Sequence, residues 1–154
     1  MTDIVVLEEG KILESTHTTQ VRGKIISVIG AARSGVAVAR LLKENGASVF
    51  VSDSCAEAKL RSGISALAAA GIAYEVGTHT HRVLDADMIV VSPGVPPAVP
   101  ILREAAGKGM RIVSEIEVAS WFFHGRIIGV TGTNGKTTVT TLIGRMLQDA
   151  RKKH

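Results

Sequence analysis

The feature that most constrains the fold is the alternation of short apolar runs with longer segments of helical periodicity. The apolar runs suit strands and lie at residues 25–29, 47–51, 72–76, 88–91 and 111–113. Helical patterns separate most of these runs, and glycine follows several of the helical patterns, where it is typical of a helix end. Strands that alternate with helices at this spacing form right-handed βαβ units. The sequence therefore predicts an α/β fold, with a five-stranded parallel sheet covered by helices on both faces.

Composition agrees with one domain of this class. The chain has 154 residues, of which 45% are hydrophobic and 21% charged, as in globular proteins. Aromatic residues make up only 3%, while glycine occurs 16 times. A core of Val, Ile, Leu and Ala is typical of a parallel sheet with helical layers, and it disfavours a β-sandwich.

Charge, cysteine content and hydropathy narrow the function classes. The net charge of +4 is partly due to the tail Arg151–Lys153, and few aromatics accompany the scattered basic residues. This pattern argues against nucleic-acid binding. Cys55 is the only cysteine, which excludes an internal disulfide and favours a reducing compartment. No apolar run approaches the ~18 residues of a membrane span, so we expect a cytoplasmic protein without a membrane partner.

The chain divides into three parts. Residues 1–22 are a polar N-terminal arm with one apolar run, and this arm suits either a flexible segment or an added edge strand. Residues 23–124 hold the five predicted strands. A new strand begins after His124-Gly125, so residues 125–154 form a C-terminal strand–loop–helix stub.

The stub contains a variant phosphate-binding loop at Thr131–Thr138. An apolar run precedes the loop and a helical pattern follows it, the arrangement in which backbone N–H groups and a helix N-terminus hold phosphates. The usual motif, G-x-x-x-x-G-K-[ST], has glycine where this chain has Val130. The loop predicts binding of a nucleotide's phosphates by Gly132, Thr133, Asn134, Gly135, Lys136, Thr137 and Thr138, with Lys136 on the phosphates and Thr137 as a ligand of Mg²⁺.

A second glycine turn, Gly30–Gly35, follows the first predicted strand and opens a helix. Rossmann-like folds keep their phosphate-binding turn at this position, and Asp53, at the end of the second strand, can bind a ribose. Ala32 replaces the glycine of the dinucleotide motif that lets the backbone approach a pyrophosphate. On pattern alone, a nucleotide site and a turn whose glycines serve only packing are equally supported. A UDP-type ligand is compatible with the alanine.

Three features together resemble the Mur ligase family. The octet Thr131–Thr138 looks like the ATP loop of these enzymes, which also lacks the first glycine. Val91–Pro96 resembles their loop after the fourth strand, and Ser114–Glu117 resembles the segment that leads into their ATP domain. Asn134 and the Ser-Pro-Gly sequence at Ser92–Gly94 are most similar to the D-glutamate-adding branch of the family.

The resemblance implies an ATP-dependent amide ligase of peptidoglycan synthesis. Its substrates would be UDP-N-acetylmuramoyl-L-alanine, ATP and D-glutamate, and the reaction would pass through an acyl phosphate. Residues 23–124 would then be a Rossmann-like UDP-binding domain, and 125–154 the incomplete start of the ATPase domain. The UDP-sugar would contact Ala32, Arg33, Ser34, Asp53, Ser54 and Gly94. Cys55 departs from the family, because an arginine often contributes to the uracil site at that position.

The family enzymes are much longer than this chain, so we expect the chain to bind UDP-sugar without being catalytically competent. The alternative is a self-standing UDP-sugar or nucleotide-binding module. A nicotinamide-binding protein is disfavoured by Ala32 and by the complete octet.

Other residues receive plainer interpretations. Cys55 is expected to be a small buried or half-buried residue. His79 and His81 are expected in a solvated loop and not in a metal site. Trp121–Phe123 suits the core or an exposed interdomain surface, through which the chain would self-associate.

Overall fold

The computed structural model describes residues 2–7, 20–123, 125 and 127–151. The chain splits into two compact units, one of residues 13–123 and the other of residues 1–12 with 124–154. The N-terminal arm predicted over residues 1–22 contributes to both units, and its stretch 8–19 lies outside the described residues.

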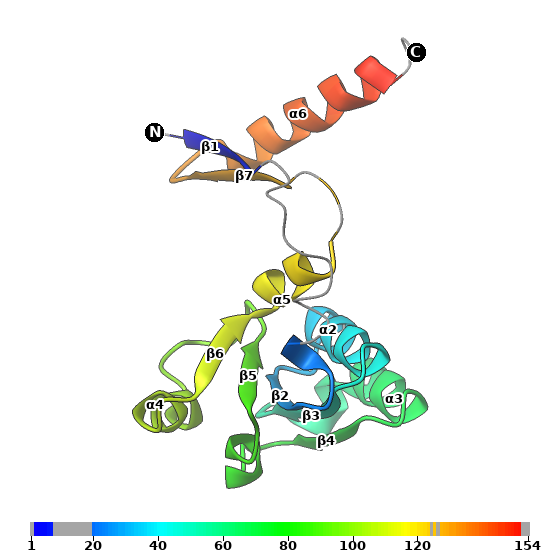
Figure 1. Cartoon of the computed structure of the whole chain (residues 1–154), viewed down its shortest axis with the longest axis vertical. Helices are drawn as coiled ribbons and strands as arrows, with labels where there is room; N and C mark the ends of the chain where they lie inside the picture. The colour runs from blue at the N-terminus through cyan, green and yellow to red at the C-terminus, as the bar shows by residue number, and fades with distance from the viewer. Residues whose placement is uncertain (1, 8–19, 124, 126, 152–154) are drawn as a thin grey trace. The chain divides into compact units, whose positions relative to one another are not determined.

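The larger unit is built on a five-stranded sheet with the order β4-β3-β2-β5-β6, in which every pair is parallel. The strands are β2 (Ile25–Ile29), β3 (Ser48–Asp53), β4 (Ala73–Val76), β5 (Met88–Val91) and β6 (Arg111–Ser114) (Figure 1). This is the Rossmann-like sheet that the sequence predicts. The direction of winding reverses between β2 and β5, and ligands of such folds bind at the carboxyl ends of the strands near this switch point.

Helices cover both faces of the sheet, as predicted. They are α2 (Arg33–Glu44), α3 (Arg61–Ala69), α4 (Pro100–Gly107) and α5 (Glu115–Trp121), with short 3₁₀ turns η1 (Glu57–Lys59) and η2 (His81–Leu84). Buried residues of α2, α3 and α5 form one core cluster with the sheet. Buried residues of α4 and η2 form a second cluster with other strand residues. The two clusters therefore lie on opposite faces.

Strand residues supply both clusters in alternation, because successive side chains of a strand point to opposite faces. In β2, Ile26 and Val28 join the α2 cluster, whereas Ile29 joins the α4 cluster. In β5, Val90 belongs to the α2 cluster and Ile89 belongs to the α4 cluster. A sheet buried on both faces needs such nearly continuous apolar strands, which explains the strength of the pattern in the sequence.

Between the second and third strands the sequence pattern predicts one helix over about residues 56–70, but the helix in the structure is shorter. The 3₁₀ turn η1 comes first, and α3 begins only at Arg61. The carboxylate of Asp53 accepts the N–H of Cys55 and holds the chain in a turn, while Ala56 is extended. This local hydrogen bond competes with an earlier helix start. The sequence pattern places Leu67 and Ala68 on the buried face of this helix; Leu67 is buried, whereas Ala68 is exposed.

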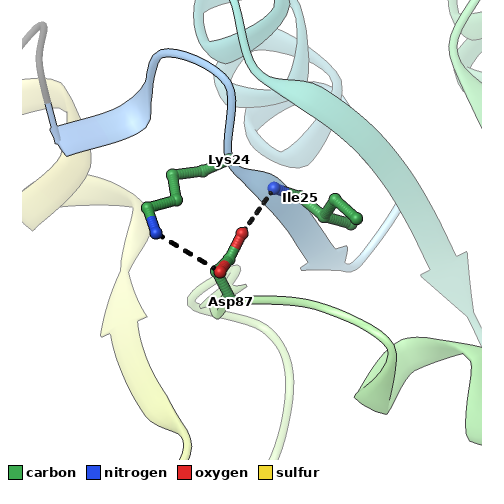
Figure 2. Close-up of polar contacts among 3 residues, drawn as sticks. All are labelled: Lys24, Ile25 and Asp87. Carbon is green, nitrogen blue, oxygen red and sulfur yellow. Dashed lines mark hydrogen bonds and ion pairs between the residues drawn. The ribbon is translucent and has the colours of Figure 1, made fainter.

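A second carboxylate ties the amino ends of the two central strands together. Asp87 accepts a hydrogen bond from the N–H of Ile25 at 2.8 Å and lies 3.4 Å from the ammonium of Lys24 (Figure 2). The N–H of Asp87 in turn donates to the carbonyl of Ile25 at 2.8 Å. The hydrogen bond from Ile25, aided by Lys24, holds the pKa of Asp87 below its ordinary value despite partial desolvation. These contacts fix β2 against β5 at the edge opposite the strands' carboxyl ends.

The smaller unit contains β1 (Thr2–Leu7), β7 (Ile127–Gly132) and α6 (Lys136–Arg151). The strands β1 and β7 pair antiparallel along their whole lengths, so the apolar run of the N-terminal arm is an added edge strand. The other end of the arm belongs to the larger unit, where Val21 is fully buried in the core. No residue of α6 is buried.

Candidate functional site

The Gly30–Gly35 turn lies between β2 and α2, at the carboxyl edge of the sheet. Gly30 has a φ of 109°, a conformation that side chains disfavour, and its N–H donates to the carbonyl of Ser52 at 2.9 Å. A Cβ on Gly35 would lie 2.0 Å from the Gly30 carbonyl oxygen. Both glycines are therefore required by the geometry of the turn itself, whatever it binds.

Asp53 holds this turn against the end of β3. Its buried carboxylate accepts hydrogen bonds from the N–H of Ala31 at 2.7 Å and of Cys55 at 2.8 Å, one on each oxygen. Asp53, predicted as a ligand residue, thus already has a structural role when no ligand is bound: it holds the Gly30–Gly35 turn to the end of β3. Each carboxylate oxygen can accept a further hydrogen bond, so the role does not exclude a ligand.

The predicted UDP-sugar contacts Ala32, Arg33 and Ser34 lie at the start of α2 and are exposed. Ala32 precedes the helix in an extended conformation, and no side chain caps the helix there. The first N–H groups of a helix have no partner within it and carry partial positive charge. This end of α2 therefore suits an anion.

An open groove of about 370 Å³ adjoins the turn, between the first turn of α2 and the η1–α3 segment. It is lined by Ala31, Ala32, Arg33, Val36, Lys59, Leu60, Ser62, Gly63 and Ala66. Two cations, Arg33 and Lys59, flank largely apolar walls. The sequence did not single out Lys59, because nothing in the pattern shows that the segment after β3 folds back beside α2.

The loop after β5 completes the edge. Ser92 is buried, its N–H donates to the carbonyl of Ile29 at 3.0 Å, and its hydroxyl has no hydrogen-bond partner among the described residues. Gly94 is exposed, and a Cβ placed on it would meet no atom within 4 Å. The space predicted for a ligand near Gly94 is therefore open.

A polar network missed by sequence reasoning lies at the carboxyl ends of β3 and β4. The fully buried Ser52 donates its hydroxyl proton to Glu75 Oε1 at 2.6 Å, and its Oγ lies 2.7 Å from His79 Nδ1. Glu75 also accepts hydrogen bonds from the N–H and hydroxyl of Thr80, at 2.9 and 2.7 Å. His79 is thus half-buried and bonded, not simply solvated as expected.

The network shifts the pKa values of two of its members. Burial lowers the pKa of His79 below its ordinary value and outweighs the opposing effect of the nearby Asp53 and Glu75. Burial acts to raise the pKa of Glu75, but the hydrogen bonds from Ser52 and Thr80, together with His79, lower it overall. Neutral histidine beside an ionised carboxylate is therefore the favoured state at neutral pH.

The expectation that Cys55 is buried or half-buried is wrong, because the residue is exposed. It lies in the turn beyond β3, where its N–H is bound by Asp53. A hydrogen bond from the thiol to Asp53, and the charge of that carboxylate, raise the pKa of Cys55. A thiol with a raised pKa is a poor nucleophile at neutral pH.

The predicted ATP loop belongs to the smaller unit. Gly132 and Gly135 have φ values of 139° and 77°, and the ammonium of Lys136 donates to the carbonyl of Gly132 across the loop. Thr137 is exposed in the first turn of α6. The strand β7 and the helix α6 flank the loop, and the phosphate-binding role of this segment stays a prediction.

The two predicted sites thus differ in how their residues are brought together. Ala32, Arg33, Ser34, Asp53 and Ser54 gather at one edge of the larger unit, and the residues of the ATP loop are consecutive in the smaller one. The described residues contain no group of three or more His, Cys, Asp or Glu side chains placed to hold a metal ion. Within the same residues, no helix has the length and apolar character needed to cross a membrane.

Several known proteins are similar to this chain. A UDP-N-acetylmuramoylalanine–D-glutamate ligase from Chlorobaculum tepidum is 46% identical over 127 residues, and one from Chlorobium limicola is 50% identical over 128. The alignments cover 82% and 83% of this chain but only 27% of each relative. A shikimate dehydrogenase structure from Aquifex aeolicus is 21% identical to this chain, with a TM-score of 0.43. The match covers 66% of this chain and 46% of the dehydrogenase chain, and the likeness is too distant to support a conclusion.

A family model gives the assignment directly. The model described as "Mur ligase MurD-like, N-terminal domain" matches residues 24–114, more than half of the chain and the whole five-stranded sheet. The match begins just before β2 and ends at the last residue of β6, so it covers the Gly30 turn, Asp53 and the Ser92–Gly94 loop. The chain belongs to the MurD-like Mur ligases and contains their N-terminal domain.

Proposed function

We propose that this chain is the nucleotide-binding end of an ATP-dependent ligase that adds D-glutamate to UDP-N-acetylmuramoyl-L-alanine through an acyl phosphate. The names of its relatives support the reaction. The observation that supports the site is the Gly30–Gly35 turn at the carboxyl edge of the sheet, which Asp53 holds in place next to the exposed start of α2, where an anion can bind. Such a ligase uses nucleotide-linked precursors, so we propose a cytoplasmic location.

The larger unit would bind the UDP part of the substrate. The first N–H groups of α2, with Arg33 and Ser34, would hold the diphosphate. Asp53 and Ser54, at the end of β3, would lie near the nucleoside. The open surface at Gly94 would leave room for the sugar.

The loop of the smaller unit would bind ATP and Mg²⁺. The left-handed Gly132 and Gly135 let backbone N–H groups converge, and the ammonium of Lys136 already lies over the loop. Thr137 would supply one oxygen ligand, and phosphates and water would supply others, because Mg²⁺ commonly keeps several such ligands. The residues present therefore fit a bound nucleotide, which would provide the phosphoryl group that activates the substrate carboxylate.

The chain spans between 27% and 30% of the length of the curated relatives that it matches. We therefore propose that the 154 residues alone bind UDP-N-acetylmuramoyl-L-alanine without catalysing ligation. The exposed side chains of Phe123 and Ile116, at 55% and 71% of their full accessibility, offer a surface for self-association. A self-standing UDP-sugar-binding module is the second candidate, supported by the compact larger unit with its own five-stranded sheet and core.

Isothermal titration calorimetry tests the site. Heat of binding with UDP-N-acetylmuramoyl-L-alanine is expected from the folded chain, and an Arg33→Ala variant should bind more weakly. No heat from a sample shown to be folded would overturn the nucleotide site. ADP release on adding ATP and D-glutamate would overturn the proposal that the chain is inactive alone.

A further inference from the structure

The network around Ser52 determines which nitrogen of His79 carries a proton. Ser52 has one hydroxyl proton, and it goes to Glu75 Oε1 at 2.6 Å. Glu75 has a lowered pKa and is ionised at neutral pH, so it has no proton to return. The 2.7 Å contact between Ser52 Oγ and His79 Nδ1 is a hydrogen bond only if Nδ1 is the donor. Neutral His79 therefore carries its proton on Nδ1.

The other ring nitrogen is then an acceptor. With Nδ1 protonated, Nε2 of the neutral ring has a free lone pair. Across the described part of the chain, Nε2 has no hydrogen-bond partner. The buried side-chain nitrogens and oxygens without a partner do not include Nε2, so this atom is not buried. Nε2 is thus open to solvent and available to a ligand.

The position of His79 relates it to the nucleotide site. Ser52, its hydrogen-bond partner, directly precedes Asp53 in β3, and the charge of Asp53 acts on the His79 ring. The Asp53 carboxylate and His79 Nε2 are therefore two acceptors at the carboxyl end of β3, near enough for the charge of Asp53 to act on the ring. Acidic residues at this place in nucleotide-binding α/β folds accept hydrogen bonds from ribose hydroxyls.

We propose that His79 Nε2 accepts a hydrogen bond from a ribose hydroxyl of the bound uridine nucleotide, at the strand end that carries Asp53. Ser52 and Glu75 act as positioning residues, because they fix the ring and its tautomer. Thr80 braces Glu75 from the same loop as His79. This role rests on the proposed UDP site and adds to it a residue that contacts the nucleoside.

The first test is spectroscopic and needs no variant. Long-range ¹H–¹⁵N NMR correlations of the wild-type chain at neutral pH should show Nδ1 of His79 protonated and Nε2 unprotonated. Ser52→Ala should weaken this preference. A wild-type ring protonated on Nε2 would overturn the inference.

The second test is a thermodynamic cycle with UDP, 2′-deoxy-UDP and 3′-deoxy-UDP as probes. His79→Phe should weaken UDP binding about five- to tenfold, as expected for one hydrogen bond. Removing the contacted ribose hydroxyl should weaken binding to the wild type by a similar factor. It should weaken binding to His79→Phe by no more than about twofold, because this variant already lacks the acceptor for that hydroxyl. The matched control, His81→Phe, changes a histidine whose side chain is 82% exposed, and it should bind like the wild type.

The outcomes separate this inference from the proposed function. No UDP binding by the folded wild type would overturn the nucleotide site as a whole. Wild-type binding of UDP, with an equal effect of His79→Phe on UDP and both deoxy analogues, would overturn only the ribose contact. Thermal unfolding of each variant shows whether its fold is intact, and the NMR result stands even where His79→Phe is unstable.

Discussion

The two glycine loops of this chain follow the same local plan, yet they are supported in different ways. Each joins a strand to a helix and contains at least one glycine with positive φ, Gly30 in the first and Gly132 and Gly135 in the second. The Gly30 turn lies over a core packed on both faces of a sheet, and Asp53 ties it to the neighbouring strand. The Thr131–Thr138 loop has no buried residue, and a bond from Lys136 to Gly132 crosses it. Local sequence can form such a loop, but tertiary packing determines how firmly it is held.

The largest contrast is expected from shortening a leucine in each unit. Leu67 of α3 is fully buried, so Leu67→Ala should lower the free energy of unfolding by about 2–5 kcal/mol. Leu142 of α6 is 52% exposed, and Leu142→Ala should change it by less than about 0.5 kcal/mol. Urea unfolding followed by circular dichroism measures both. Equal losses would remove the distinction between the units.

A smaller contrast lies within the larger unit, between two glycines of the candidate site. Gly35→Ala places a methyl group against the backbone carbonyl of Gly30, and we expect a loss of about 1–3 kcal/mol in the free energy of unfolding. Gly94→Ala meets no neighbouring atom and should be nearly neutral in stability. A neutral Gly35→Ala would show that the turn is not held as tightly as the geometry indicates.

Acidification should destabilise the larger unit through His79 and Glu75. The folded state lowers the pKa of His79 below its ordinary 6.5. As pH falls through that value, the histidine binds a proton more readily in the unfolded chain than in the folded one, so the free energy of unfolding decreases. Glu75 adds a second loss as pH falls below its ordinary 4.5 towards its lower folded pKa. Urea midpoints across this range measure both steps. His79→Gln should abolish the upper step, whereas the exposed His81→Gln should leave it in place.

The smallest effect is expected in the ATP loop. Lys136→Ala removes an exposed side chain and its bond to Gly132, and the free energy of unfolding should change by less than about 0.5 kcal/mol. Lys136→Gln, which keeps a polar side chain, serves as the matched comparison. A loss above about 1 kcal/mol in either variant would mean that the loop contributes to packing, contrary to the comparison above.

The sheet and most of its helices could be predicted because their residues carry periodic patterns. Strands buried on both faces have to be almost wholly apolar, as at Met88–Val91, and Ser114 caps α5 by accepting the N–H of Glu117, as its spacing indicates. The start of α3 was missed because one side chain, that of Asp53, competes with the helix.

The sequence by itself determined the fold class, the two glycine loops and the family, because these depend on periodicity and on residues close together in the chain. Only the tertiary structure decided that the N-terminal run pairs with β7, that Asp53 binds the Gly30 turn, and that Ser52 joins Glu75 to His79. Those contacts join segments far apart in sequence, and a hydrogen bond between them leaves no periodic trace. The residues that orient a site are selected by their neighbours in space.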